Sequence, residues 1–143
     1  MLVGEYRHTI DDKGRLILPA KFRNEFADGL VITKGFEKSL FVYSKTYWLR
    51  VAEKIQSMQM LSKDVRQLSR FFFGGACETS LDRNGRLILP PQLRSHAEIK
   101  KEVVFLGVYN RLEIWSKEKW EAYEAEAESS IEEIAEKLRD IGI

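Results

Sequence analysis

Two segments of this sequence are nearly the same, and this internal repeat constrains the fold more than any other feature. TIDDKGRLILPAKFR begins at Thr9, and SLDRNGRLILPPQLR begins at Ser80. Between Asp11 and Arg23, 8 of the 13 positions are identical to the positions 71 residues later. The offset then becomes 72, where the matching pairs are Leu40 and Leu112, Ser44 and Ser116, Lys45 and Lys117, and Trp48 and Trp120. A nearly constant offset of this kind indicates one supersecondary unit per copy.

The length of each copy predicts that the two copies share one core. About seventy residues form only a marginal hydrophobic core when they fold alone. The composition, with 44% hydrophobic and 31% charged residues, is that of a soluble globular protein. The single cysteine, Cys77, excludes an intramolecular disulfide and is compatible with a reducing compartment. No apolar run approaches the roughly twenty residues of a membrane helix, and the N-terminus lacks signal-peptide regions, so we expect a cytoplasmic protein.

Each copy is predicted to contain a strand, a turn, a returning strand, a short helix, two more strands and a longer helix. Alternation over residues 5–10 predicts the first strand, and the turn follows at 11–14. The apolar run Arg15 to Leu18 is interpreted as the returning strand of a local hairpin. Ser44, Ser62 and Ser116 are predicted helix caps. A long last helix is predicted from the apolar steps at Ala127, Ile131, Ile134, Leu138 and Ile141.

Charge is distributed unevenly along the chain. Residues 1–100 carry 17 lysines and arginines against 11 acidic residues, whereas residues 101–143 carry 6 against 11. This pattern predicts a face that binds a polyanion and an acidic helix that is solvated or packs between subunits. Ordinary surface scatter is the alternative interpretation. We divide the chain into copy one (4–48), connecting helices (49–75), copy two (76–120) and an acidic C-terminal helix (121–143).

The motif Asp-x-x-x-Arg occurs once in each turn, at Asp11–Arg15 and Asp82–Arg86. A tight turn closed by a local ion pair would explain one motif, but exposed pairs of this kind stabilise a protein by only about 0–1 kcal/mol. An arginine fork suits guanine edges and phosphates, and an aspartate four residues earlier can hold it in one orientation. We therefore predict DNA contact at both turns.

These residues also carry a family resemblance. GEYRHTIDDKGRLILPAKFR and DRNGRLILPPQLR resemble the two signature segments of the MraZ family of bacterial transcriptional regulators, within the swapped-hairpin AbrB/SpoVT/MazE-like superfamily. The resemblance runs from about Gly4 to Trp120. It implies an α+β fold of two tandem, pseudo-symmetric swapped-hairpin AbrB-like repeats that share a small β-barrel-like core, with appended helices.

The resemblance further implies a cytoplasmic, nucleoid-associated, ring-shaped homo-oligomer. Such a protein binds double-stranded DNA at short G-rich direct repeats upstream of its own operon, the division and cell-wall gene cluster, and usually represses it. No cofactor, metal, membrane or small-molecule substrate is expected. Asp11 and Asp82 would orient the arginines, and the predicted DNA-binding residues are Arg7, His8, Lys13, Arg15, Lys21, Arg23, Arg83, Arg86 and Arg94.

The two copies are not expected to contribute equally. Asn84 stands where copy one has Lys13, and Gln92 stands where it has Lys21. We expect copy one to dominate because it is more basic and adds Arg7 and His8. His8 is equally well interpreted as a structural strand residue.

Other classes of protein fit the sequence less well. The sequence has only two histidines and one cysteine, which are not closely spaced, so it offers few ligands for a zinc site and few residues for a thiol-catalytic centre. No glycine-rich stretch matches a nucleotide-binding motif. The main alternative is a protein–protein module, either a toxin-neutralising antitoxin or an assembly scaffold. A duplicated hairpin followed by a patterned helix argues against the antitoxin.

Overall fold

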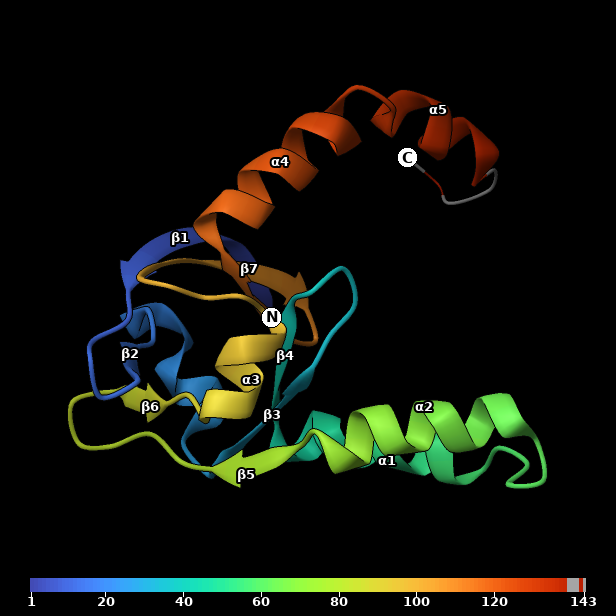
Figure 1. The fold of residues 1–143 in the computed structure, drawn as a ribbon, viewed down its shortest axis with the longest axis horizontal. Helices are drawn as coiled ribbons and strands as arrows, with labels where there is room; N and C mark the ends of the chain where they lie inside the picture. Colours follow the sequence, from blue (N-terminus) through green and yellow to red (C-terminus); the bar gives the residue numbers. More distant parts are fainter. Residues whose placement is uncertain (139–141, 143) are drawn as a thin grey trace.

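The computed structural model describes residues 1–138 and 142, and its elements follow the predicted order within each copy (Figure 1). Copy one contributes β1 (Leu2–Thr9), β2 (Arg15–Ile17), the 3-10 helix η1 (Ala20–Phe26), β3 (Leu30–Lys34), β4 (Leu40–Ser44) and α1 (Lys45–Gln56). After α2 (Lys63–Gly74), copy two contributes β5 (Cys77–Thr79), β6 (Arg86–Ile88), α3 (Pro91–His96), β7 (Glu102–Tyr109), β8 (Leu112–Ser116) and α4 (Lys117–Glu128). The last element is α5 (Ile131–Lys137), and the whole is an α+β fold.

A six-stranded antiparallel sheet mixes the strands of the two copies in the order β1-β7-β8-β4-β3-β5. The first strand of each copy pairs with the third strand of the other, so that β1 pairs with β7 and β5 pairs with β3. The fourth strands, β4 and β8, pair with each other near the middle. The two copies therefore complete one another's sheet.

The predicted local hairpins are wrong. β2 does not return along β1 but pairs antiparallel with β6, forming a separate two-stranded ribbon between the copies. In this ribbon Leu16 lies opposite Leu87, and both side chains are fully buried. Because the returning strands leave their own copies and meet, the two leucines are buried on the same face of the ribbon.

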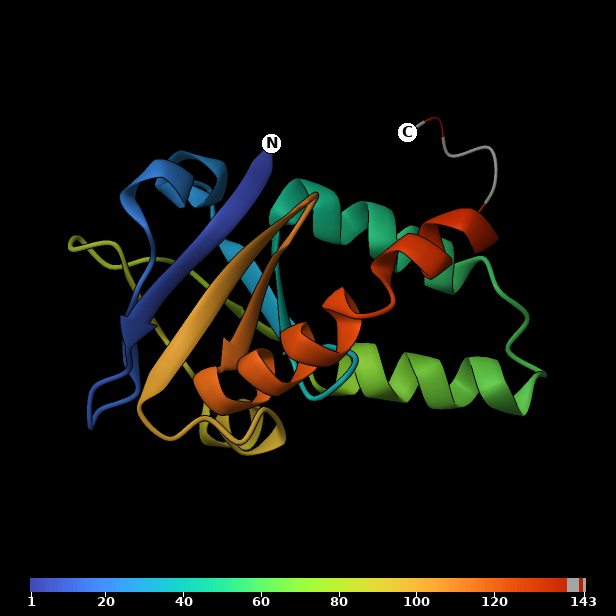
Figure 2. The same ribbon diagram turned by 90° about the horizontal axis from the view of Figure 1, so that it is seen from above.

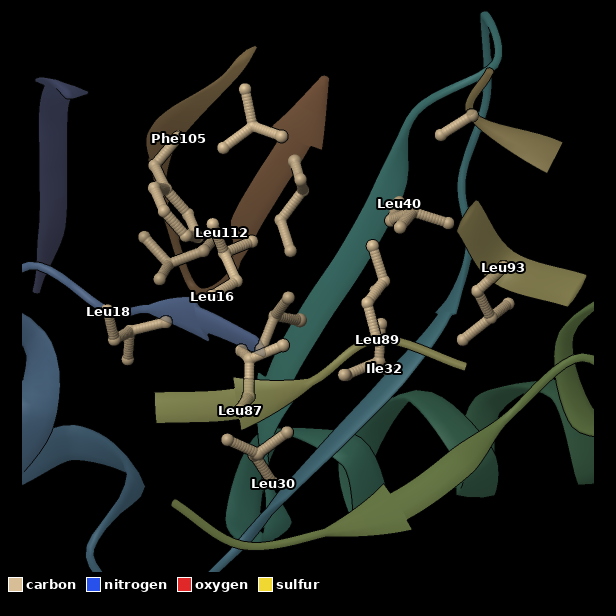
Figure 3. Packing of buried hydrophobic residues seen from close by; sticks show 14 of the residues in the cluster. Leu16, Leu18, Leu30, Ile32, Leu40, Leu87, Leu89, Leu93, Phe105 and Leu112 are labelled. Atoms are coloured by element: carbon tan, nitrogen blue, oxygen red, sulfur yellow. The ribbon is translucent and has the colours of Figure 1, made fainter. Parts of the chain in front are cut away.

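One hydrophobic core joins the copies beneath the ribbon. Its buried members include Leu16, Leu18 and Phe22 from copy one, and Leu87 and Leu89 from copy two. Figure 3 shows these leucines converging with side chains of β3, β4 and β8. Rigid placement of the two turns follows, because both strands that leave them are anchored in the same core.

Helices α1 and α2 extend together from the sheet (Figures 1 and 2). The predicted caps are confirmed: the hydroxyls of Ser44 and Ser62 accept hydrogen bonds from the N–H groups of Tyr47 and Val65. A second aromatic core of Phe41, Tyr43, Ile55 and Phe72 attaches this helical pair to β4. Phe71, Phe72 and Phe73 belong to or pack against that core.

The prediction of a single long C-terminal helix is also wrong. α4 ends at Glu128 and α5 begins at Ile131, because the hydroxyls of Ser129 and Ser130 donate to the carbonyls of Glu126 and Ala127 and so replace helical hydrogen bonds. The predicted cap at Ser116 is confirmed for α4. Neither helix has a buried residue, and both project from the sheet in Figure 1. The predicted seam position Ile141 lies outside the described residues.

Candidate nucleic-acid interface

The two turns have the same backbone geometry. In the first, the N–H of Asp11 donates to the carbonyl of Arg15 at 3.0 Å, and the N–H of Gly14 donates to the carbonyl of Asp11 at 3.0 Å. Asp82, Arg86 and Gly85 make the equivalent bonds at 2.9 and 3.0 Å. The glycines adopt φ values of +78° and +73°, a conformation that L side chains rarely take. Each turn is thus a defined loop rather than a flexible connection.

The aspartate of each turn binds both the backbone and the arginine. Asp11 Oδ1 accepts the N–H groups of Lys13 and Arg15, each at 2.9 Å, while Oδ2 accepts Arg15 Nε at 2.6 Å. These donors, the backbone N–H of Arg15 most of all, lower the pKa of the Asp11 carboxyl from its ordinary value. The carboxylate therefore stays ionised and fixes the guanidinium relative to the turn.

The second turn repeats this arrangement. Asp82 Oδ1 accepts the N–H groups of Asn84 and Arg86 at 2.8 and 3.0 Å, and Oδ2 accepts Arg86 Nε at 2.8 Å. The backbone N–H of Arg86 is again the main cause of a lowered pKa, here of the Asp82 carboxyl. Both arginines are therefore held through Nε by their own aspartate.

Hydrogen bonds between the copies hold the two turns beside the shared ribbon. The N–H of Leu89 donates to the carbonyl of Gly14 at 2.8 Å, and the N–H of Leu18 donates to the carbonyl of Gly85 at 3.0 Å. Arg23 donates from Nε to the Leu18 carbonyl, and its side chain lies over Gly85, so closely that a Cβ there would collide with the guanidinium. Figures 1 and 2 show both turns at the same end of the molecule.

The guanidinium groups of both turns remain open to a ligand. The side chains of Arg15 and Arg86 are 34% and 28% exposed. Across residues 1–138 and 142, neither arginine hydrogen-bonds another residue through Nη1 or Nη2. The planar edge that recognises a guanine or a phosphate is therefore unoccupied by the protein itself.

Three other predicted residues lie on or near the turns. Lys13 and Arg83 are exposed within them. Lys21 is exposed on η1, with its Nζ 5.3 Å from the ring centroid of Tyr6. Lys13 and Arg83 therefore add positive charge to the two turns that hold the clamped arginines.

The remaining predicted residues have other partners. Arg7 on β1 forms ion pairs with Glu121 of α4 at 2.9 Å and with Glu5 at 3.4 Å, and the bond to Glu121 is the main cause of its raised pKa. The His8 ring packs edge-on against buried Phe105. Arg94, the counterpart of Arg23, instead donates to the carbonyls of Ile99 and Lys100. The structure therefore does not gather these residues with the turns, and the pairing of Arg7 weakens the argument that copy one dominates.

A family model described as "MraZ protein, putative antitoxin-like" matches this chain twice, over residues 1–71 and 72–141. The chain belongs to the MraZ family. Two proteins named transcriptional regulator MraZ, from Caldanaerobacter subterraneus and Moorella thermoacetica, are each 50% identical to it over 143 residues and the full length of both chains. A protein of the same name from Natranaerobius thermophilus is 48% identical over the same span.

Sequence reasoning missed two side chains beside the arginines of this MraZ family member. Ile17 and Ile88 lie on the outer face of the ribbon, 43% and 61% exposed. The signal was present in the run Arg-Leu-Ile-Leu, because strand alternation turns the leucines inward and the isoleucine outward with the arginine.

Two further observations concern metal ions and membrane-spanning helices. Within the described residues, histidine, cysteine and acidic side chains form no group of three or more that could hold a metal ion. None of the helices in that part of the chain is long and apolar enough to cross a membrane.

Proposed function

We propose that this chain is a sequence-specific DNA-binding transcriptional regulator that represses its own operon, the division and cell-wall gene cluster. It binds short G-rich direct repeats of the promoter. One observation carries the proposal: two arginines are each clamped through Nε by an aspartate, their Nη groups bind no other residue of the described chain, and their turns lie at the same end of the molecule. Full-length relatives named as transcriptional regulators support the same class of function.

Arg15 and Arg86 contact base edges or the flanking phosphates in this proposal, and Asp11 and Asp82 orient them. Lys13, Lys21, Arg23, Arg83 and Arg94 contribute mainly attraction to phosphates. Arg23 acts partly through its contact with the second turn. Arg94 acts at longer range, because its side chain donates hydrogen bonds to carbonyl groups of its own copy. Arg7 would have to leave Glu121 in order to bind DNA.

We further propose a swapped-hairpin arrangement of two AbrB-like repeats, at residues 4–48 and 76–120, separated by connecting helices (49–75) and followed by an acidic C-terminal segment (121–143). The pairing of β2 with β6 supports it. A ring-shaped homo-oligomer in the cytoplasm, associated with the nucleoid, would place several turn pairs along spaced DNA repeats, so that weak single contacts add up. Exposed Ile131 and Ile134 on α5, and Leu138 at its C-terminal end, are available for contacts between subunits.

The test is a titration of the purified protein with duplex DNA from the region upstream of its own gene, competed with scrambled DNA of equal composition. We expect selective binding whose affinity falls steeply as salt rises, because lysines and arginines release counterions from phosphates. Equal affinity for both DNAs would contradict the proposal. Co-purification of a co-expressed protein in that case would support the protein–protein alternative, an antitoxin or scaffold.

A further inference from the structure

The outer face of the β2–β6 ribbon combines two arginines with two isoleucines. Arg15 lies opposite Ile88, and Ile17 lies opposite Arg86. Side chains alternate along each strand, so these four share one face while Leu16 and Leu87 fill the other. Residues directly opposite one another have Cβ atoms about 5 Å apart. Each clamped arginine therefore has an exposed isoleucine from the other copy beside it.

Packing within the chain does not account for these isoleucines. Leu16 and Leu87, their neighbours on the inner face, are fully buried, whereas Ile17 and Ile88 are 43% and 61% exposed. A strand residue in water gains little from being isoleucine unless something covers it. The cations around the ribbon, Lys13 and Arg83 in the turns and the two arginines on the face, favour a polyanion as the covering partner over a second apolar surface.

The shape of the ribbon fits duplex DNA. The major groove of B-DNA, about 12 Å wide, admits a two-stranded β-ribbon, whose strands lie about 4.8 Å apart. In that groove guanine presents acceptors suited to arginine, and thymine presents a C5 methyl group that an apolar side chain can contact. The alternating face of arginine and isoleucine therefore matches neighbouring base pairs of these two kinds.

We propose that Ile17 and Ile88 determine specificity by contacting thymine methyl groups in the major groove, next to the bases that face Arg15 and Arg86. This inference rests on the proposed DNA-binding function and adds an apolar part to its recognition surface. The ribbon face, and not the two turns alone, then selects the sequence. Copy one and copy two each supply one arginine and one isoleucine to it.

The experiment compares upstream duplex DNA containing thymine with the same duplex containing uracil, which lacks only the methyl group. We expect the wild-type protein to bind the uracil DNA about fivefold more weakly, at the lower end of the discrimination usual for one altered base pair. The variant Ile17→Ala/Ile88→Ala should bind thymine DNA more weakly by a similar factor and should no longer distinguish thymine from uracil.

A matched control uses another exposed aliphatic pair. Val3 and Val108 lie opposite each other on β1 and β7, 45% and 37% exposed, so Val3→Ala/Val108→Ala removes similar apolar surface from the large sheet. This variant should keep the full preference for thymine. If the isoleucine variant keeps it as well, or if wild type ignores the methyl group, the inference is wrong while selective DNA binding stands.

Two further outcomes would overturn the inference in other ways. Sedimentation of Ile17→Ala/Ile88→Ala should show the same assembly mass as wild type, and a changed mass would assign the ribbon face to contacts between copies. Equal affinity of wild type for upstream and scrambled DNA would instead remove the proposed function, and the inference with it.

Discussion

At the scale of single residues, the main effect of the aspartates of the two turns is to fix the orientation of the arginine side chains. Asp11 and Asp82 are about 40% exposed, so their ion pairs with Arg15 and Arg86 add little to stability in water. Each carboxylate also accepts two backbone N–H groups of its turn. The arginine is thereby ordered in the free protein, so that the proposed contact with DNA would cost less side-chain entropy.

Asp11→Asn tests this role, with Asp12→Asn as the matched control. Both changes remove one negative charge from the same turn, and Asp12 is exposed. We expect Asp11→Asn to lower the preference for upstream over scrambled DNA roughly two- to tenfold, because ordering one side chain on binding costs about 0.5–1.5 kcal/mol. Asp12→Asn should bind as well as wild type or slightly better. Equal behaviour of the two variants in a competition titration would contradict the orienting role.

The lowered pKa values of Asp11 and Asp82 predict how the turns respond to acid. A carboxyl with a folded-state pKa below its unfolded value contributes stability above the unfolded value, and that stability is lost as pH falls through the folded pKa. Because hydrogen bonds from the turn lower both pKa values, the turns should stay intact at pH 5 and open only below the ordinary value of 3.8. Carboxyl carbon shifts followed by NMR would measure both midpoints; a midpoint above 3.8 would contradict the hydrogen-bonded turn.

At the scale of elements, local signals predicted the helices, and the repeat concealed the strand pairing. Ser44, Ser62 and Ser116 were recognisable as caps because a cap depends on the next three residues alone. Strand partners were not recognisable, because Arg15–Ile17 and Arg86–Ile88 have the same sequence, and hydrophobic alternation fits pairing within or between copies equally well. The break at Ser129 was missed because the apolar spacing continues across it.

The attachment of α2 to the sheet gives a prediction at this scale. The buried Thr33 hydroxyl on β3 donates to the Phe72 carbonyl at 2.7 Å. Thr33→Val keeps the shape of the side chain but leaves that carbonyl without this donor, so the free energy of unfolding should fall by about 1–3 kcal/mol. Thr33→Ser retains the hydroxyl and should lose less. Urea denaturation measures both, and an equally stable Thr33→Val would show that the bond contributes nothing.

At the scale of the whole molecule, the two copies form one structure whose two ends are built from different elements. The turns and ribbon lie at one end, and α1 and α2 reach the other (Figures 1 and 2). The basic turns of the candidate site were predictable from local sequence. The contact of Arg23 with Gly85 was not, because it joins copies whose relative placement no local pattern specifies. For the same reason, the different hydrogen bonds of Arg94 at the equivalent position could not be predicted.

A shared core predicts a single unfolding transition that depends on the ribbon. Leu87→Ala should lower the free energy of unfolding by about 2–5 kcal/mol, since Leu87 is fully buried between the copies. Ile88→Ala, at the neighbouring exposed position, should change it by only about 0.5 kcal/mol. Circular dichroism and tryptophan fluorescence should report the same transition in urea. Separate transitions for the two probes would indicate two independently folding copies.

One set of binding titrations tests whether the two clamped arginines together bind the duplex. Arg15→Ala, Arg86→Ala and the exposed α2 variant Arg70→Ala each remove one positive charge. We expect the first two to weaken binding to upstream DNA by about tenfold or more, and Arg70→Ala to weaken it by less than about twofold. The claim would be contradicted if Arg15→Ala and Arg86→Ala bound that DNA as tightly as Arg70→Ala.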